Sequence, residues 1–159
     1  MAVDGPSPPA ARGRPRDGTL DERILEQVVA LQSIDVPDSG TLHGDLHALL
    51  HGAVETFVRG RGQFVPRLLR EAGHHPEITD LLHAVLHTRR QAYRRVLARA
   101  IARGELDPSA DQELLIDMLI GPVWTRLLIT RDPITREYVD ANVQMVLTAF
   151  HVPSATPAG

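Results

Sequence analysis

The segment QELLIDMLIGPVWTRLLI, residues 112–129, decides the fold class of this chain of 159 residues. Its apolar side chains recur at helical spacing but surround nearly the whole helix, so a single core face cannot bury them all. These side chains are Leu114, Leu115, Met118, Leu119, Ile120, Val123, Trp124, Leu127, Leu128 and Ile129. A second surface must therefore cover part of this helix. We expect a kink near Gly121-Pro122, because proline lacks the backbone N–H that a helix interior requires.

A last helix is predicted after Asp132-Pro133, capped by Thr135 and ending near Phe150, with a single apolar stripe. In a chain this short, both C-terminal helices can cover their excess apolar surface by pairing with a second copy as a four-helix bundle. A monomer in which the other helices surround residues 112–129 is the alternative that the patterning leaves open. The expected dimer contacts are Leu119, Val123, Leu127, Val139, Val143, Val146 and Phe150.

The rest of the chain also has helical spacing and no period-two strand pattern, which predicts an all-α fold. Start and stop signals divide it into helices over residues 19–32, from Thr41 to Gly60 or Gly62, 63–72 and 76–103, with Gly104 as a C-cap. The helix that contains residues 112–129 is expected to begin at a capping box from Ser109 to Gln112. Residues 1–18 and 152–159 are rich in Pro, Gly and small residues, and we expect both to be disordered.

Composition excludes several classes of protein. No apolar run reaches the roughly 18 residues of a membrane span, and no signal-peptide core is present, so a cytoplasmic protein is expected. The chain contains no Cys, which excludes disulfides and thiolate chemistry. A formal net charge of -3 argues against a generally basic nucleic-acid binder.

Five short motifs suggest a family. They are Val36-Pro37-Asp38-Ser39-Gly40-Thr41-Leu42 with Gly44-Asp45-Leu46, Arg89-Arg90, Ala102-Arg103-Gly104-Glu105-Leu106, Leu119-Ile120-Gly121-Pro122, and Arg126-Leu127-Leu128. In this order and spacing they resemble the C-terminal domain of TetR/AcrR transcription regulators over about residues 34–150. The resemblance implies a TetR-like helical bundle over residues 42–151, an effector pocket within it, and a homodimer built from the last two helices.

The resemblance also indicates which side chains to examine for an unknown small-molecule effector. The candidates lie on the helices that would enclose the pocket: Phe57, Phe64, Leu68, Leu86, Tyr93, Met118 and Trp124. Apolar residues at helical spacing more often line a dry core than a ligand cavity, and that alternative remains open for each of them.

The N-terminus resembles the same family, but only in part. Arg12-Gly13-Arg14-Pro15-Arg16 is similar to the basic arm before the first helix, and residues 21–25 are similar to that helix. The helix-turn-helix should follow, yet the chain passes from a first-helix remnant at 19–32 through a linker at 33–41 into the helical body. We therefore expect an internal deletion near Ala30. Without a recognition helix, we expect DNA binding to be weak. The residues expected to contact DNA are Arg12, Arg14 and Arg16, which could enter a minor groove. The alternative is that this basic arm is a solvated tail that does not bind DNA.

Two further patterns are expected to be structural. His43, His47 and His51, like His83 and His87, recur every four residues as a metal site requires, but they flank or oppose the apolar faces, so surface positions and no metal are expected. A metal-dependent activity that uses these histidines is the alternative. The basic series from Arg89 to Arg103 is likewise expected to be a solvated surface. The chain has no His-Glu-x-x-His, Gly-x-Ser-x-Gly, P-loop or dinucleotide motif, so neither catalysis nor a cofactor is expected.

The sequence thus predicts a dimeric, ligand-responsive regulator that has lost autonomous operator recognition. Such a chain could also form a heterodimer with a full-length relative and weaken the binding of that relative to a palindromic site, because two half-sites require two DNA-binding domains. A small-molecule-sequestering helical module without a transcriptional role is the alternative.

Overall fold

The computed structural model of this protein describes residues 34–56, 69–70 and 72–150. Every regular element among these residues is helical, as the periodicity predicted, and the described residues form no strand. The elements are α2 (Leu42–Val54), α4 (Pro76–Ala102), α5 (Gln112–Thr125), a π-helical turn η2 (Arg126–Thr130) and α6 (Arg136–Ala149). The helices predicted at 19–32 and, for the most part, at 63–72 lie outside the described residues. None of the described helices is long and apolar enough to cross a membrane.

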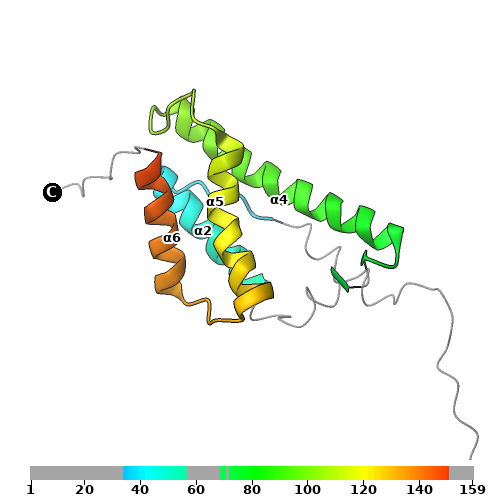
Figure 1. The fold of residues 1–159 in the computed structure, drawn as a ribbon. Coiled ribbons are helices and arrows are strands. Elements are labelled where there is room, and N and C mark those ends of the chain that lie inside the picture. Colours follow the sequence, from blue (N-terminus) through cyan, green and yellow to red (C-terminus); the bar gives the residue numbers. More distant parts are fainter. Residues whose placement is uncertain (1–33, 57–68, 71, 151–159) are drawn as a thin grey trace, which may run out of the picture.

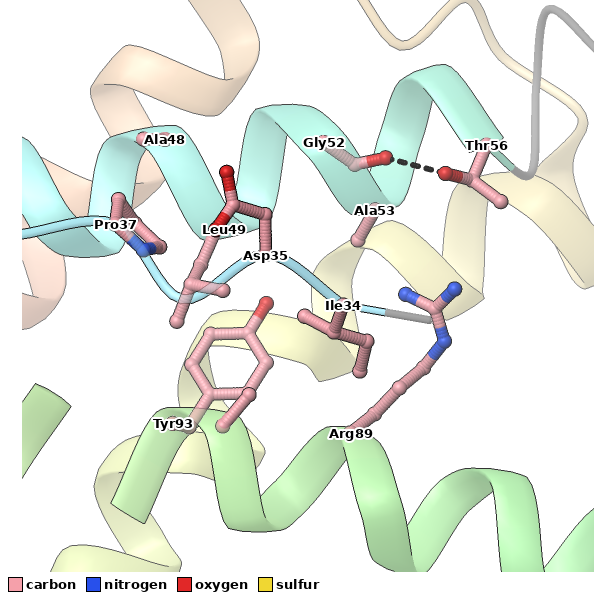
Figure 2. Close-up of a pocket in the computed structure, with 11 residues that line it drawn as sticks. Ile34, Asp35, Pro37, Ala48, Leu49, Gly52, Ala53, Thr56, Arg89 and Tyr93 are labelled. Atoms are coloured by element: carbon pink, nitrogen blue, oxygen red, sulfur yellow. Dashed lines mark hydrogen bonds between the residues drawn. The ribbon is translucent and has the colours of Figure 1, made fainter. Parts of the chain in front are cut away.

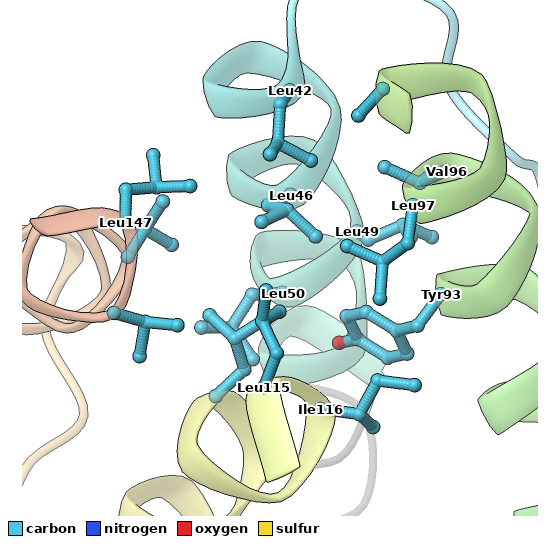
Figure 3. Packing of buried hydrophobic residues seen from close by; sticks show 14 of the residues in the cluster. Leu42, Leu46, Leu49, Leu50, Tyr93, Val96, Leu97, Leu115, Ile116 and Leu147 are labelled. Carbon is cyan, nitrogen blue, oxygen red and sulfur yellow. The ribbon is translucent and has the colours of Figure 1, made fainter. Parts of the chain in front are cut away.

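The helix α2 lies at the centre of the bundle. It contacts α4, α5 and α6, and Figure 1 shows it between α4 and α6 with α5 in front. Its leucines are spaced so that all of them reach the core: Leu42, Leu46, Leu49 and Leu50 are at most 6% exposed. Figure 3 shows these leucines meeting side chains from α4, α5 and α6. Burial of each leucine contributes about 1.5–3 kcal/mol, so α2 organises the whole bundle.

The helix ends confirm most of the predicted start and stop signals. Thr41 Oγ1 accepts a hydrogen bond from Gly44 N (3.1 Å), and Thr135 Oγ1 accepts one from Tyr138 N (3.2 Å). Gly104 has φ +75° after the last turn of α4, where Glu105 N donates to Ala100 O (2.9 Å) in a Schellman motif. The predicted capping box at Ser109 is wrong, because Asp111 is the N-cap of α5 and accepts from Leu114 N at 3.0 Å.

The C-terminal helices differ from the prediction in how their apolar faces are used. Leu119, Val123, Val139, Val143 and Val146 are at most 6% exposed within a single protomer, so they are core residues and not the expected dimer contacts. Leu127 and Phe150 are half-buried against the same protomer. The reason is that α5 and α6 pack against α2 as well as against each other, which covers their most regular apolar stripes.

A buried carboxylate joins the beginning of α2 to the end of α4. Asp45 is fully buried; its Oδ1 accepts hydrogen bonds from Ser39 N (2.6 Å) and Ser39 Oγ (2.8 Å). Its Oδ2 lies 3.5 Å from Arg99 Nη2 and 3.6 Å from Arg103 Nη2. A Cβ at position 44 would overlap Ser39 Oγ, which explains why a glycine precedes Asp45.

Other arginines of α4 are bonded to α5, so the predicted solvated basic surface is wrong for most of the series. Arg90 Nη2 lies 2.5 Å from Glu113 Oε2, Arg90 Nη1 lies 2.7 Å from Asp117 Oδ1, and Arg94 Nε lies 2.6 Å from Glu113 Oε1. These hydrogen bonds from Arg94 and Arg90 lower the pKa of Glu113 to about 2. The series therefore joins α4 to α5 near one end and to the start of α2 near the other.

The bond network around Asp45 generates a prediction on stability. We expect Asp45→Ala to lower the free energy of unfolding by about 2–3 kcal/mol, because two guanidinium groups and the Ser39 donors lose a buried acceptor. The measurement is urea denaturation followed by circular dichroism. Asp38→Ala is the matched control: this carboxylate is 63% exposed and 3.9 Å from the same arginines, so its loss should cost less than about 0.5 kcal/mol. Equal effects of the two substitutions would contradict the role of Asp45 as the buried acceptor that joins α2 to α4.

Candidate ligand-binding site

Two cavities lie on either side of Tyr93. The larger, about 360 Å³, is enclosed by α2, α4, α5 and η2. The smaller, about 260 Å³, lies between α2, α4 and the segment before α2. Ala53, Arg89 and Tyr93 line both cavities, so these three residues form the partition between them.

The larger cavity exists because the helical body has two separate apolar clusters. The main cluster holds Leu50, Tyr93 and Val123, whereas a smaller one holds Ile78 and Val85 with Leu82, Trp124, Leu127 and Leu128 packed against it. Residues of both clusters line the cavity, which lies where the two meet. A space of this kind suits an apolar molecule, because its walls offer few polar partners.

Tyr93 places a polar atom in these apolar surroundings. The side chain is 5% exposed, and its hydroxyl has no hydrogen-bond partner among the described residues. Burial raises the pKa of the Tyr93 hydroxyl, which remains protonated and available as a donor. Figure 2 shows the ring of Tyr93 projecting from α4 toward α2 and the segment that contains Ile34 and Asp35. A buried hydroxyl without a partner costs about 1–3 kcal/mol, a cost that a bound acceptor would remove.

Arg89 supplies the charge of the site. Burial lowers the pKa of its guanidinium, which still carries its positive charge near neutral pH. Figure 2 shows Arg89 projecting from the same face of α4 as Tyr93, one helical turn away. Arg89 places a positive charge at the partition between the two cavities. Arg90 also lines the larger cavity, and its guanidinium is bonded to Glu113 and Asp117.

The structure brings together three of the predicted pocket residues. Leu86, Tyr93 and Trp124 line the larger cavity. Met118 does not; it packs against the main cluster, because it lies six residues before Trp124 and hence about 240° around the helix. Phe57, Phe64 and Leu68 lie outside the described residues, as do Arg12, Arg14 and Arg16.

Sequence reasoning missed Arg89 as a cavity residue. The signal was present in its spacing, since Arg89 lies three residues after Leu86 and four before Tyr93 on one face of α4. It was assigned to a solvated basic surface because long charged side chains are seldom buried.

The predicted surface histidines fall into two groups. His43, His83 and His87 are exposed, as expected. His47 and His51 are half-buried on α2, and His47 Nε2 forms a hydrogen bond with Asp140 Oδ1 of α6. The expectation of solvated side chains is therefore wrong for these two.

The described residues thus form a helical body with a largely apolar cavity, bounded on one side by Ala53, Arg89 and Tyr93. The sequence profile "Tetracyclin repressor-like, C-terminal domain" matches residues 36–146, so this chain belongs to the TetR family of transcription regulators through that domain. The family is one of regulators and not of enzymes, which agrees with the prediction made from the missing catalytic motifs.

Two relatives support the assignment. The chain is 31% identical over 132 residues to the uncharacterized HTH-type transcriptional regulator YdeS of Bacillus subtilis (strain 168), a match that covers 81% of this chain and 64% of YdeS. The chain thus spans less than two thirds of the length of this curated relative. The crystal structure of the TetR family transcription regulator SCO0332 superposes with a TM-score of 0.67 at 26% identity, over 77% of this chain and 73% of SCO0332.

Proposed function

We propose that this chain is a dimeric, effector-binding member of the TetR family that lacks autonomous operator recognition. The observation that carries the proposal is the cavity of about 360 Å³ with the buried, unpartnered Tyr93 hydroxyl at its partition. A dry core would gain stability from a phenylalanine at this position, whereas a binding site retains a donor that is satisfied only when the ligand is present.

The lining of the cavity indicates the chemical class of the effector. An apolar body fits the walls formed by Leu82, Leu86 and Leu128. An anionic or accepting head group fits the partition, where Tyr93 offers a hydroxyl and Arg89 a positive charge. Charge-assisted hydrogen bonds are about twice as strong as neutral ones, so a carboxylate is favoured over an alcohol of the same length. We therefore propose an amphipathic anion as effector.

The proposed dimer uses a different face from the one expected from sequence. Among the described residues, four large hydrophobic side chains are exposed: Leu69 (37%), Leu114 (50%), Ile129 (76%) and Met145 (59%). The last three belong to α5, η2 and α6, the elements that the family resemblance assigns to dimerisation. We propose that the outer faces of these elements contact a second copy, while their inner faces complete the core of each protomer.

The proposed loss of operator recognition rests on the sequence before the helical body. Residues 12–16 resemble the family's basic arm and residues 21–25 resemble its first helix, whereas the match to the C-terminal domain begins at Val36. We propose that the turn and the recognition helix are deleted between these two parts. A domain of this kind can still act on transcription by pairing with a full-length relative. The alternative function, sequestration of a small molecule without any regulatory partner, uses the same cavity; co-purification with a full-length relative separates the two.

Decanoate is a simple probe of the proposed effector chemistry. We expect it to change the fluorescence of Trp124, the single tryptophan of the chain and a cavity residue, and to bind at least about tenfold tighter than decanol. Tyr93→Phe should weaken decanoate binding about tenfold or more, because a hydrogen bond to a charged group contributes about 1.5–3 kcal/mol. The matched control is Tyr138→Phe, since Tyr138 stacks under Arg126 and lines neither cavity. Equal binding by Tyr93→Phe and the wild type would refute the proposed site.

The proposed interface predicts the behaviour of a charged substitution on α6. Met145→Glu should weaken self-association at least about 100-fold, because an unpaired carboxylate would be buried between two copies. Light scattering after size exclusion, over a dilution series, measures this change. Ala98→Glu, on an exposed position of α4, adds the same charge elsewhere and should leave the dimer intact. A wild-type chain that is monomeric at micromolar concentration, or a dimeric Met145→Glu variant, would contradict the interface.

DNA binding provides the third prediction. In gel shifts at physiological salt, the wild-type chain alone should bind DNA from upstream of its own gene no tighter than about 1 μM, with no preference over a shuffled sequence of equal length. Replacing Arg12, Arg14 and Arg16 by Ala should remove the residual shift. Nanomolar, sequence-specific binding by the chain alone would overturn the proposed loss of operator recognition.

A further inference from the structure

Three potential metal ligands lie apart from the ligand cavities, where α2 packs against α6. His47 and His51 are one turn apart on α2, and Asp140 faces them from α6. All three are half-buried, and one potential ligand atom from each lies within 4.8 Å of the others. We propose that His47, His51 and Asp140 bind a divalent transition-metal ion that bridges α2 and α6.

The donor set defines the class of ion. Two imidazole nitrogens and one carboxylate oxygen are the ligands that Zn²⁺ and its neighbours Co²⁺ and Ni²⁺ accept, whereas Ca²⁺ and Mg²⁺ prefer oxygen alone. Three protein ligands leave one tetrahedral position open, which is typical of a Zn²⁺ site that also holds water or a further ligand.

The geometry of α2 brings the two imidazoles to the same ion. Residues four apart lie on one face of a helix, and the ring centroids of His47 and His51 are 4.9 Å apart. His51 Nε2 is buried and has no hydrogen-bond partner among the described residues. A buried nitrogen without a partner costs free energy that coordination of a metal would recover. This unsatisfied atom distinguishes the site from an ordinary pair of surface histidines.

The hydrogen bond between His47 and Asp140 already brings two of the proposed ligands together across α2 and α6. His47 Nε2 and Asp140 Oδ1 are held together by a hydrogen bond, so a proton occupies the line between two of the proposed ligand atoms. Ligand atoms of a tetrahedral Zn²⁺ lie about 3.3 Å apart at bond lengths of about 2.0 Å. Binding would therefore displace that proton, and the Asp140 side chain, 46% exposed, has room to adjust to this spacing.

The surroundings leave room for a fourth ligand. A cavity of about 570 Å³ adjoins the two histidines and is also lined by Glu55, Arg136 and Glu137. Glu137 lies three residues before Asp140, on the same side of α6, and is a candidate for the fourth position. The positive charge of Arg136 at the cavity is offset by the two glutamates, so the charges around the site do not exclude a cation.

The chain contains its own control for adventitious binding. His83 and His87 have the same i, i+4 spacing on α4, but both are exposed and no carboxylate cluster accompanies them in the described part of the chain. Any two histidines at this spacing bind transition metals weakly. The proposed site at His47, His51 and Asp140 must therefore bind the ion more tightly than the pair of His83 and His87 does.

The test uses the full chain without a histidine tag, titrated with Zn²⁺ in competition with a chromophoric chelator. We expect the wild type to bind one ion per chain. Asp140→Asn and His51→Phe should each weaken Zn²⁺ binding at least about 100-fold, because even the loss of a residue that only supports a metal ligand costs about 10–100-fold in affinity. The double variant His83→Ala/His87→Ala should bind as the wild type does. Co²⁺ in place of Zn²⁺ should give the intense visible absorption of a tetrahedral site in the wild type and in His83→Ala/His87→Ala, but not in Asp140→Asn or His51→Phe.

Two results would overturn the proposal. One is Zn²⁺ affinity in Asp140→Asn and His51→Phe equal to that of the wild type; the other is loss of binding only when His83 and His87 are replaced. Circular dichroism with EDTA verifies that each variant is folded. Asp140→Asn keeps the size and hydrogen-bonding capacity of the side chain, so it decides the outcome even if His51→Phe disturbs the packing of α2.

Discussion

The buried Asp45 carboxylate is the constraint on which the arrangement of the helices depends. It joins the start of α2 to the last turns of α4 through Ser39, Arg99 and Arg103. Glu105 strengthens the same junction, because its carboxylate accepts a hydrogen bond from Leu42 N at 2.5 Å. The two helices are thereby joined at this point, and the larger cavity lies farther along them, beside Ala53 near the end of α2 and Arg89 in the middle of α4. The polar junction and the apolar cavity thus occupy different stretches of the same pair of helices.

Elements whose ends are defined by local chemistry could be predicted from the sequence. Thr41, Gly104 and Thr135 act through backbone groups within a few residues, so their roles are readable without a tertiary structure. The use of each helix face could not be predicted in this way. Val123 and Val143 read as surplus apolar surface until α2 is placed against them, and Arg89 reads as exposed until α2 and the segment before it cover α4.

The candidate site also combines features that could be predicted from local sequence with features that depend on the tertiary structure. The spacing of Leu86, Tyr93 and Trp124 indicated that they belong to the interior, and the family resemblance indicated that the interior is hollow. The lack of a hydrogen-bond partner for the Tyr93 hydroxyl among the described residues is a tertiary feature, because residues of α2, α5 and the segment before α2 line the cavities beside it. Similarly, the hydrogen bond between His47 and Asp140 joins residues that are 93 positions apart in the sequence, so no local sequence pattern predicts it.

The π-helical turn after α5 has a consequence for the shape of the interior. A π turn accommodates one more residue per turn than an α-helix, and Arg131, at φ +59°, ends it. Relative to a continuous α-helix, that extra residue changes the direction in which the following side chains of the turn project. Leu127 and Leu128 line the cavity from within this wide turn, and Arg131 begins the connection to α6. The same five residues therefore form part of the cavity wall and lead directly into the connection to the last helix.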